Sequence, residues 1–354
     1  MPKQRNSSFE LIRILCIFFV VFWHSIGPYT NDLSTGNLVG SSFVNTLTNN
    51  TNLLFMMVSG YFGIRFNLEK LIKLDIAIIF YDLLHLFLFG EFGIKSVIIA
   101  CMPITFKSHW FISYYFVITI LSGFLNKIPE QLDRKSFRNL ILLLLFLFYV
   151  IPTVFFYEII EDAGKGVVCM TIMYLIGRYI RLHLNDLSFS QKKLAAVFFS
   201  VSILATVLNI ILSLKKGVFT GMYCRDNSIL IAVTAISFFL FFREMNFSSR
   251  IINHLSGDVV ILYCIEGYAR KFFWQYFDLA PYTKSPYFIG IVFVFAVVVF
   301  LFCILLNELR RLLFDRIDGA LAALIMKPVN ACTPALINGY RRAHDGMVQF
   351  LRKK

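Results

Sequence analysis

Ten long apolar stretches, separated by short polar loops, constrain the fold of this chain more than any other feature. Each is about as long as a helix that crosses a lipid bilayer. Charged residues make up 16% of the sequence, well below the roughly 25% of a soluble domain. The pattern predicts an all-α, polytopic membrane helical bundle of about ten transmembrane helices. The expected spans are residues 9–28, 43–63, 71–90, 109–126, 138–156, 167–182, 194–214, 227–242, 257–277 and 286–307.

The basic residues predict which ends of these spans face the cytoplasm. With the N-terminus inside, 25 of the 34 lysines and arginines fall on the inner side and 9 on the outer side. Inner loops of membrane proteins are rich in Lys and Arg. The bias therefore predicts a multi-pass protein of the cell membrane with cytoplasmic N- and C-termini. The first span lacks the cleavage pattern of a secretory signal, so we expect it to remain in the protein.

Residues 308–354 form a second region behind the membrane domain, which is expected at residues 1–307. They predict a basic, amphipathic cytoplasmic tail that is attracted to anionic membrane lipid. The net charge of +13 would also be typical of a nucleic-acid-binding protein. We exclude that class, because the basic residues flank apolar spans and form no separate basic domain. The expected partners therefore include membrane lipid and no nucleic acid.

The first span carries two residues that are costly in hydrocarbon, Arg13 near its start and His24 near its end. Eleven residues at about 100° each place both on one face of a helix, roughly 16 Å apart along its axis. Ionisable groups inside spans usually face a bundle interior or a water-filled cavity. Arg13 would then lie in the inner half of the membrane and His24 in the outer half. The alternative is that Arg13 reaches to the interface and His24 bonds a neighbouring helix.

Further polar side chains lie within the third span. Asp75, Asp82 and His85 share about a third of the helix circumference. Either carboxylate could pair with a basic residue such as Arg13, or could orient a histidine. An Asp-x-x-His pair supplies only two metal ligands, so we expect no metal site. The seven cysteines lie mostly in or beside apolar stretches, and we expect them to be small buried side chains and not a disulfide framework.

Three other spans carry informative residues. Ser59-Gly60 in the second span would let two helix backbones pack closely. Glu266 and Arg270 in the ninth span are four residues apart and can form an ion pair along one helix. His109 and Trp110 begin the fourth span, where tryptophan is typical of the membrane interface. Such polar groups within a bundle suggest a cavity for a polar or charged ligand. Composition and spacing leave open whether the cavity belongs to an enzyme or to a transport path.

Six sequence elements, in this order, resemble the integral-membrane acyltransferase family 3, which includes bacterial O-acetyltransferases of surface polysaccharides. The first is an acidic residue three before an arginine, then ten residues, then a histidine. Here these are Glu10, Arg13 and His24. Together the elements cover about residues 8–307. The other five are Leu54 to Ser59-Gly60, His109-Trp110-Phe111 with Asn126, Tyr174 to Gly177, residues 227–243, and Ser256 to Glu266.

The resemblance implies that the chain is an acyltransferase of the cell envelope. The family transfers an acyl group, most often acetyl, from cytoplasmic acyl-CoA to a hydroxyl of an extracytoplasmic or lipid-linked polysaccharide. Acetyl-CoA is then the expected co-substrate and the glycan the expected acceptor. His24 is expected to act as general base on the acceptor hydroxyl or to carry the acyl group covalently. The sequence leaves both routes open.

The resemblance also assigns roles to other residues. Arg13 is expected to bind a phosphate of coenzyme A or to stabilise charge on the thioester oxygen, with Glu10 orienting it in the catalytic set. Arg65 is the second expected cofactor contact. It corresponds to the first arginine of an Arg-x-Arg pair that the family often shows. The residues expected to bind the acceptor are His109, Trp110 and Glu266, the last standing where many members carry histidine.

A transporter or flippase for a polar or lipid-linked substrate is the alternative function, because it would use the same buried charges. Transporters usually show two related halves with broken helices at corresponding positions. The sequence shows no such internal symmetry. The acyltransferase interpretation is therefore favoured.

Overall fold

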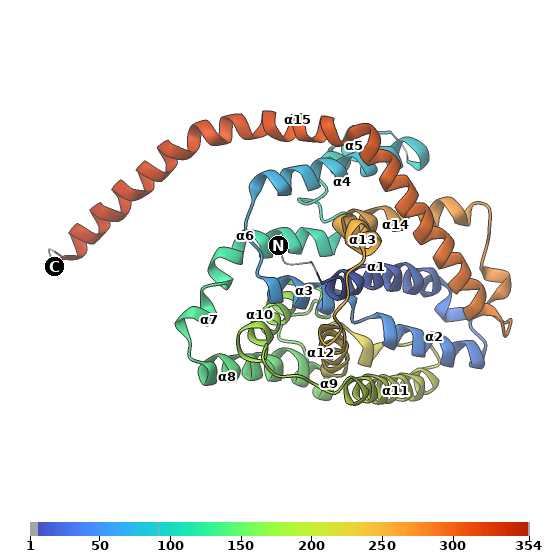
Figure 1. The fold of residues 1–354 in the computed structure, drawn as a ribbon. Coiled ribbons are helices and arrows are strands. Elements are labelled where there is room, and N and C mark those ends of the chain that lie inside the picture. Colours follow the sequence, from blue (N-terminus) through green and yellow to red (C-terminus); the bar gives the residue numbers. More distant parts are fainter. Residues whose placement is uncertain (1–5, 91, 353–354) are drawn as a thin grey trace.

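The computed structural model describes the backbone of residues 6–90 and 92–352, and their side chains up to residue 332. Within this part, every regular element is a helix (Figure 1). The α-helices are α1 (Ser8–Ile26), α2 (Thr35–Thr48), α3 (Thr51–Phe62), α4 (Leu68–Phe89), α5 (Ile94–Cys101), α6 (Trp110–Leu125), α7 (Ile128–Gln131), α8 (Arg134–Leu145), α9 (Ile151–Phe155), α10 (Val167–His183), α11 (Gln191–Lys216), α12 (Ile229–Arg243), α13 (Arg250–Leu255), α14 (Val259–Trp274) and α15 (Phe288–Arg352).

Helix α1 lies in the middle of the bundle and packs against α2, α3, α12, α14 and α15 (Figure 1). Its apolar residues Ile12, Val21 and Ile26 are fully buried. Its first turn is tied to α13, because the hydroxyl of Ser7 donates to the side chain of Asn253 at 2.8 Å. With packed helices on several sides, polar groups of α1 meet side chains of neighbouring helices.

Helices α3 and α10 cross with their backbones in close contact. A Cβ atom added at Gly60 would overlap the carbonyl oxygen of Tyr174, and one added at Gly177 would overlap that of Met57. Glycine is therefore required on both sides of the crossing. This confirms the prediction that Gly60 lets two helix backbones approach each other. It also explains Gly177, which belongs to another of the elements that resemble the family.

Five helices within the described residues are long and apolar enough to cross a membrane. They cover Ser8–Asp32, Trp110–Gln131, Arg134–Phe155, Gln191–Lys216 and Phe288–Cys332, and Ile229–Arg243 is a shorter apolar helix. The chain is thus an all-helical protein with five candidate membrane spans. The full number of ten transmembrane helices stays a prediction.

Two of the other expected spans are interrupted. The stretch at 43–63 is divided between α2 and α3, which meet at Asn49 and Asn50. Five polar residues, Thr48 to Asn52, follow one another here, and such side chains compete with the helix for backbone hydrogen bonds. The stretch at 257–277 begins in a 3₁₀ turn, Ser256–Asp258, that joins α13 to α14. The first of these breaks places Asn49 and Asn52 beside the C-terminal end of α1.

Helix α15 continues without a break from the last expected span into the expected tail. It follows one flank of the bundle and then extends away from it towards the C-terminus (Figure 1). Arg311 donates to Asp258 at 2.8 Å, which ties α15 to the start of α14. The helix backbone therefore does not mark the expected boundary at residue 307. The division into a membrane domain and a basic tail stays a prediction.

Candidate active site

His24, Glu266 and Arg270 form a hydrogen-bonded chain between α1 and α14. Nδ1 of His24 lies 2.7 Å from Oε1 of Glu266, and Nε of Arg270 donates to Oε2 of Glu266 at 2.7 Å. Arg270 also donates through Nη1 to the backbone carbonyl of His24 at 2.9 Å. The Glu266 side chain is 6% exposed, whereas that of His24 is 41% exposed. The ion pair predicted between Glu266 and Arg270 is present, and it continues to the imidazole.

This chain of contacts defines the protonation of the imidazole. Glu266 is paired with a guanidinium that is always charged, so its carboxylate is ionised and can only accept hydrogen bonds. Nδ1 of His24 must therefore carry the proton in their hydrogen bond. In the neutral ring, the lone pair then sits on Nε2. That atom can remove a proton from a hydroxyl or attack a carbonyl carbon.

Arg13 lies three helical turns before His24 on α1 and pairs with Glu10, with 3.0 Å between Nη1 and Oε2. Its side chain is 22% exposed and that of Glu10 is 5% exposed. The Nε–H group of Arg13 is buried and has no hydrogen-bond partner among the described residues. The geometry supports the orientation of Arg13 by Glu10. It also leaves this guanidinium a free donor for the oxygen of a ligand.

His24 lines a polar pocket of about 70 Å³ at the C-terminal end of α1. A cavity needs roughly 10–15 Å³ to hold one water molecule. The pocket can therefore take several waters, or one polar edge of a larger ligand. Its walls come from α1, from the break between α2 and α3, from α6 and α14, and from the loops before α10 and α12. They include Trp23, His24, Asn52, Trp110, Lys165 and Asp226.

Asp226 reaches this pocket from the connection between α11 and α12. The residue is 1% exposed, and the amide of Asn52 donates to its two carboxylate oxygens at 3.4 and 3.5 Å. Burial raises the pKa of Asp226 to about 7, although the charge of Lys165 opposes this rise. Both hydrogen bonds are long. The carboxylate is therefore poorly compensated for a group removed from water.

The loop between α9 and α10 is braced against the same connection. Glu158 forms an ion pair with Arg225 and accepts the backbone N–H of Ala163 at 2.9 Å. Gly164 has a φ of +81°, which favours glycine. A Cβ atom added there would overlap the backbone nitrogen of Asn227. These contacts hold the loop, and with it the neighbouring Lys165, over the pocket.

A second histidine–carboxylate pair lies near the first. Nε2 of His109 is 2.8 Å from Oδ1 of Asp82, and the hydroxyl of Tyr268 donates to the same oxygen at 2.7 Å. The ring of His85 stacks on Tyr268, with 4.0 Å between the ring centres. Asp82 therefore orients a histidine and does not pair with Arg13. Among the described residues, no group of three His, Cys, Asp or Glu side chains is placed to hold a metal ion.

A pocket of about 250 Å³ brings together the three residues expected to bind the acceptor, His109, Trp110 and Glu266. Trp110 also lines the pocket at His24, so the two pockets adjoin. Trp274 lines the larger pocket and Trp23 the smaller one. All three tryptophans of the chain thus lie at this place.

Size alone does not identify the active site. A cavity of about 680 Å³ lies between α14 and α15, and its walls include Phe273, Phe277 and Val294. Its lining contains no carboxylate, imidazole or ammonium group, so it offers no acid, base or cation for a reaction. The candidate active site is therefore the pair of smaller pockets beside His24.

Residues 6–307 match the profile of a family described as an acyltransferase domain, acyltransferase family 3. The chain belongs to this family. The matched segment includes the whole hydrogen-bonded chain of His24, Glu266 and Arg270. No curated protein and no solved structure matches the chain. The resemblance seen in the sequence is confirmed by the family match, which covers nearly all of the expected membrane domain.

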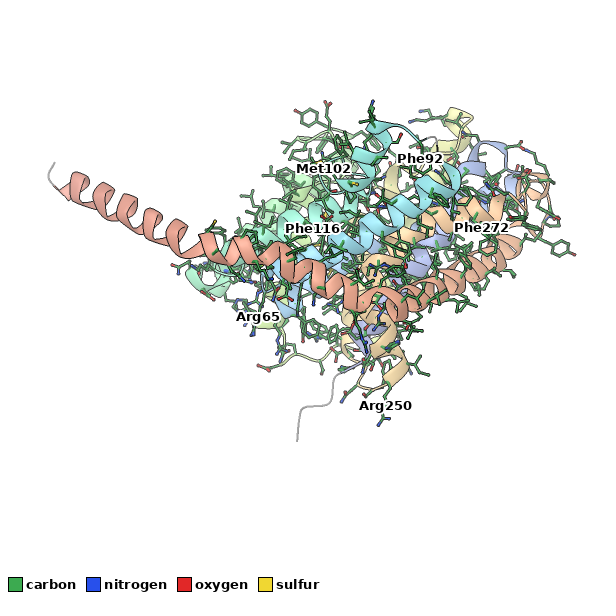
Figure 2. All side chains as sticks on the ribbon, turned by 90° about the horizontal axis from the view of Figure 1, so that it is seen from above. Arg65, Phe92, Met102, Phe116, Arg250 and Phe272 are labelled. Atoms are coloured by element: carbon green, nitrogen blue, oxygen red, sulfur yellow. The ribbon has the colours of Figure 1, made fainter. Side chains whose placement is uncertain are left out.

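In this acyltransferase, Arg65 lies in the linker between α3 and α4 and is exposed at the edge of the bundle (Figure 2). The amide of Asn126 donates to the carbonyl of Ile64 at 2.9 Å, and the hydroxyl of Tyr174 accepts the N–H of Ile64 at 3.0 Å. Tyr174 in turn donates to Asn126 at 2.7 Å. Asn126 and Tyr174 come from two elements that resemble the family. Their contacts position the linker that carries Arg65.

Sequence reasoning about this acyltransferase missed Arg178 and Arg181 of α10. Nη1 of Arg178 lies 3.0 Å from where a Cβ of Gly63 would be, and its Nε is buried without a hydrogen-bond partner in the described chain. Arg181 donates to Asn185 at 2.9 Å. The helical spacing of Tyr174, Arg178 and Arg181, four and then three residues apart, could have revealed this shared face.

Proposed function

We propose that this acyltransferase moves an acetyl group from acetyl-CoA to a hydroxyl of an extracytoplasmic or lipid-linked polysaccharide. The observation that carries the proposal is the chain of His24, Glu266 and Arg270 beside a polar pocket. Acyl transfer to an alcohol needs a base or nucleophile with a free lone pair, and Nε2 of His24 supplies it. The family match supports acyl transfer as the reaction class.

The proposed donor side lies at the inner end of the bundle. Arg13, oriented by Glu10, would stabilise negative charge on the thioester oxygen or bind a phosphate through its unpartnered Nε–H. Arg65 would bind a phosphate of coenzyme A from the exposed linker after α3. Arg178 adds a second cation beside that linker. Fixed guanidinium groups suit phosphate, because they offer several donors in one plane.

Two routes remain for the chemical step, and both fit the geometry at His24. In the first, Nε2 takes the proton of the acceptor hydroxyl while its oxygen attacks the thioester carbon. The carbon–sulfur bond breaks, and the proton passes to the leaving thiolate of coenzyme A. In the second, Nε2 attacks the thioester carbon first and the thiolate leaves. The acceptor oxygen then displaces the acyl group from Nε2 and loses its proton to the freed imidazole.

The proposed setting is the cell membrane, crossed about ten times with both termini in the cytoplasm. The excess of lysine and arginine on the expected inner side supports this orientation. It places Arg65 towards the cytoplasmic pool of acetyl-CoA and His24 towards the outer half. A transfer from an inner donor to an outer acceptor then follows the axis of α1.

Mass spectrometry of surface glycans from cells with and without the protein tests this function. We expect the glycan to lose one acyl mass per modified sugar when the protein is absent. Purified protein with labelled acetyl-CoA and the alkali-deacylated glycan should release free coenzyme A and place label on sugar. Movement of a glycan without label transfer would instead support a carrier and would contradict the proposal.

A further inference from the structure

The pocket at His24 has a shape that suits one edge of a sugar. Its volume of about 70 Å³ is too small for several sugar units, but it can take a pair of hydroxyl groups on one ring. The residues that line the pocket include His24, Asn52 and Asp226. A hydroxyl beside the imidazole would thus have a neighbouring hydroxyl within the same small space.

Asp226 is the group in this pocket that most needs a ligand. Its carboxylate is almost completely buried. Within the described part of the chain, the hydrogen bonds to its oxygens come from Asn52 and are long, at 3.4 and 3.5 Å. Each carboxylate oxygen has two lone pairs to satisfy. A bound diol would supply further O–H donors to these two oxygens.

The remaining walls fit the apolar faces and the mouth of a sugar site. Trp23 and Trp110 present aromatic rings to the pocket, and such rings combine a large apolar face with a polar N–H group. Nζ of Lys165 lies 5.7 Å from the centre of the Trp110 ring. The braced loop after α9 therefore adds an ammonium donor to the pocket lining. The pocket lining therefore combines a carboxylate and an amide, an ammonium donor and two aromatic residues.

We propose that Asp226, with Asn52, binds the acceptor sugar by accepting a hydrogen bond from the hydroxyl next to the one that His24 activates. This inference rests on the proposed O-acyl transfer to a glycan. It assigns the acceptor chemistry as a vicinal diol on a sugar ring. It also makes Asp226 a determinant of which hydroxyl is acylated, because a diol held at one oxygen presents the other to Nε2.

Label transfer from acetyl-CoA to the alkali-deacylated surface polysaccharide of the producing cells tests this inference. Rates are measured with purified wild-type protein, Asp226→Asn, Asp226→Ala and Asn52→Ala at varied acceptor and donor concentrations. Glu161→Gln is the matched control, since it removes an exposed acidic side chain from the braced loop, outside the pocket lining. Gel filtration and thermal midpoints report whether each variant is folded.

We expect the KM for the polysaccharide to rise about tenfold or more in Asp226→Ala and Asn52→Ala, as for a lost hydrogen bond to a charged group. The KM for acetyl-CoA should change less than twofold. NMR of the product should show acetyl groups spread over more ring positions with Asp226→Asn. Unchanged acceptor KM and unchanged positions in folded Asp226→Asn and Asn52→Ala would overturn the inference alone. Absence of label transfer by the wild type would overturn the proposed function as well.

Discussion

Nδ1 of His24 lies 2.7 Å from Oε1 of Glu266, although the two residues are 242 positions apart in the chain. The contact joins the first helix of the bundle to α14, near the end of the segment that matches the family. A glutamate held by Arg270 thus defines which imidazole nitrogen is free.

Glu266→Gln should lower the rate of acyl transfer by about 10²-fold or more, while the protein stays folded in the membrane. An amide can donate to Nδ1 and so favour the wrong tautomer, which removes the lone pair from Nε2. The measurement is label transfer from acetyl-CoA to the deacylated polysaccharide. Glu308→Gln is the control, because Glu308 contacts His254 far from His24 in sequence and structure. Wild-type rates in Glu266→Gln would contradict the role given to this pair.

His24→Ala and His24→Gln should both abolish measurable transfer. General-base assistance alone contributes about 10²–10⁴-fold, and a covalent route would lose its nucleophile completely. Mass spectrometry of surface glycans from cells that express each variant is the measurement, with membrane abundance checked by immunoblot. If both variants acylate the glycan as the wild type does, His24 is not the catalytic group.

Arg65→Ala and Arg178→Ala should each raise the KM for acetyl-CoA about tenfold and leave the KM for the acceptor unchanged. Each variant would lose the proposed charge-assisted hydrogen bond to a phosphate of coenzyme A. Arg250→Ala is the control, because Arg250 is an exposed arginine that projects from the bundle near α13 (Figure 2). If the acceptor KM rises and the acetyl-CoA KM does not change, these arginines act on the acceptor side and the prediction is wrong.

Gly60→Ala and Gly177→Ala should destabilise the crossing of α3 and α10. The added methyl group meets backbone atoms on both sides, and overpacking of this kind costs about 1–3 kcal/mol. Thermal unfolding in detergent should show a lower midpoint for each variant. Gly123→Ala in α6 is the matched control, since a Cβ at that position meets no atom within 4 Å. Equal midpoints for all three variants would show that the crossing tolerates side chains.

Asp226→Asn should raise thermal stability more at pH 8 than at pH 5. The pKa of Asp226 is raised from 3.8 to about 7 in the folded protein, chiefly by burial. The folded state therefore holds this proton between pH 4 and pH 7 when the unfolded state does not. The contribution of Asp226 to the free energy of unfolding therefore falls as the pH rises through that range. The fall between pH 5 and pH 8 is about 3 kcal/mol.

The measurement for Asp226→Asn is the difference in thermal midpoint between variant and wild type at the two pH values. Lys165, Asp162 and His24 also face or surround this carboxylate. Their own titration is present in both proteins and largely cancels in the difference. A difference that is the same at pH 5 and pH 8 would show that the carboxyl group is ionised at both.

The apolar pattern predicted an all-helical membrane protein, and motif spacing selected His24, Arg13, Glu266 and Arg270. The pattern did not show the break at Asn49 and Asn50, because hydropathy is averaged over a window in which the flanking apolar residues outweigh the short polar run. It also could not show which spans touch. The contact between His24 and Glu266 depends on the packing of α1 against α14.

Asp226 and Lys165 were beyond sequence reasoning for another physical reason. Both lie in loops, where side chains follow no fixed period that would indicate a shared face. Their meeting depends on the brace between Glu158 and Arg225 and on the contact of Gly164 with Asn227. Such a site is defined by tertiary contacts alone.

The placement of Trp23, Trp110 and Trp274 at the two adjoining pockets gives the protein a built-in optical reporter. The chain contains no other tryptophan, so its intrinsic indole fluorescence comes entirely from the walls of the candidate active site. A glycan or an acyl donor that displaces water there should change emission intensity or wavelength. Occupancy of the site could then be followed in real time, without a dye and in a variant that has lost turnover.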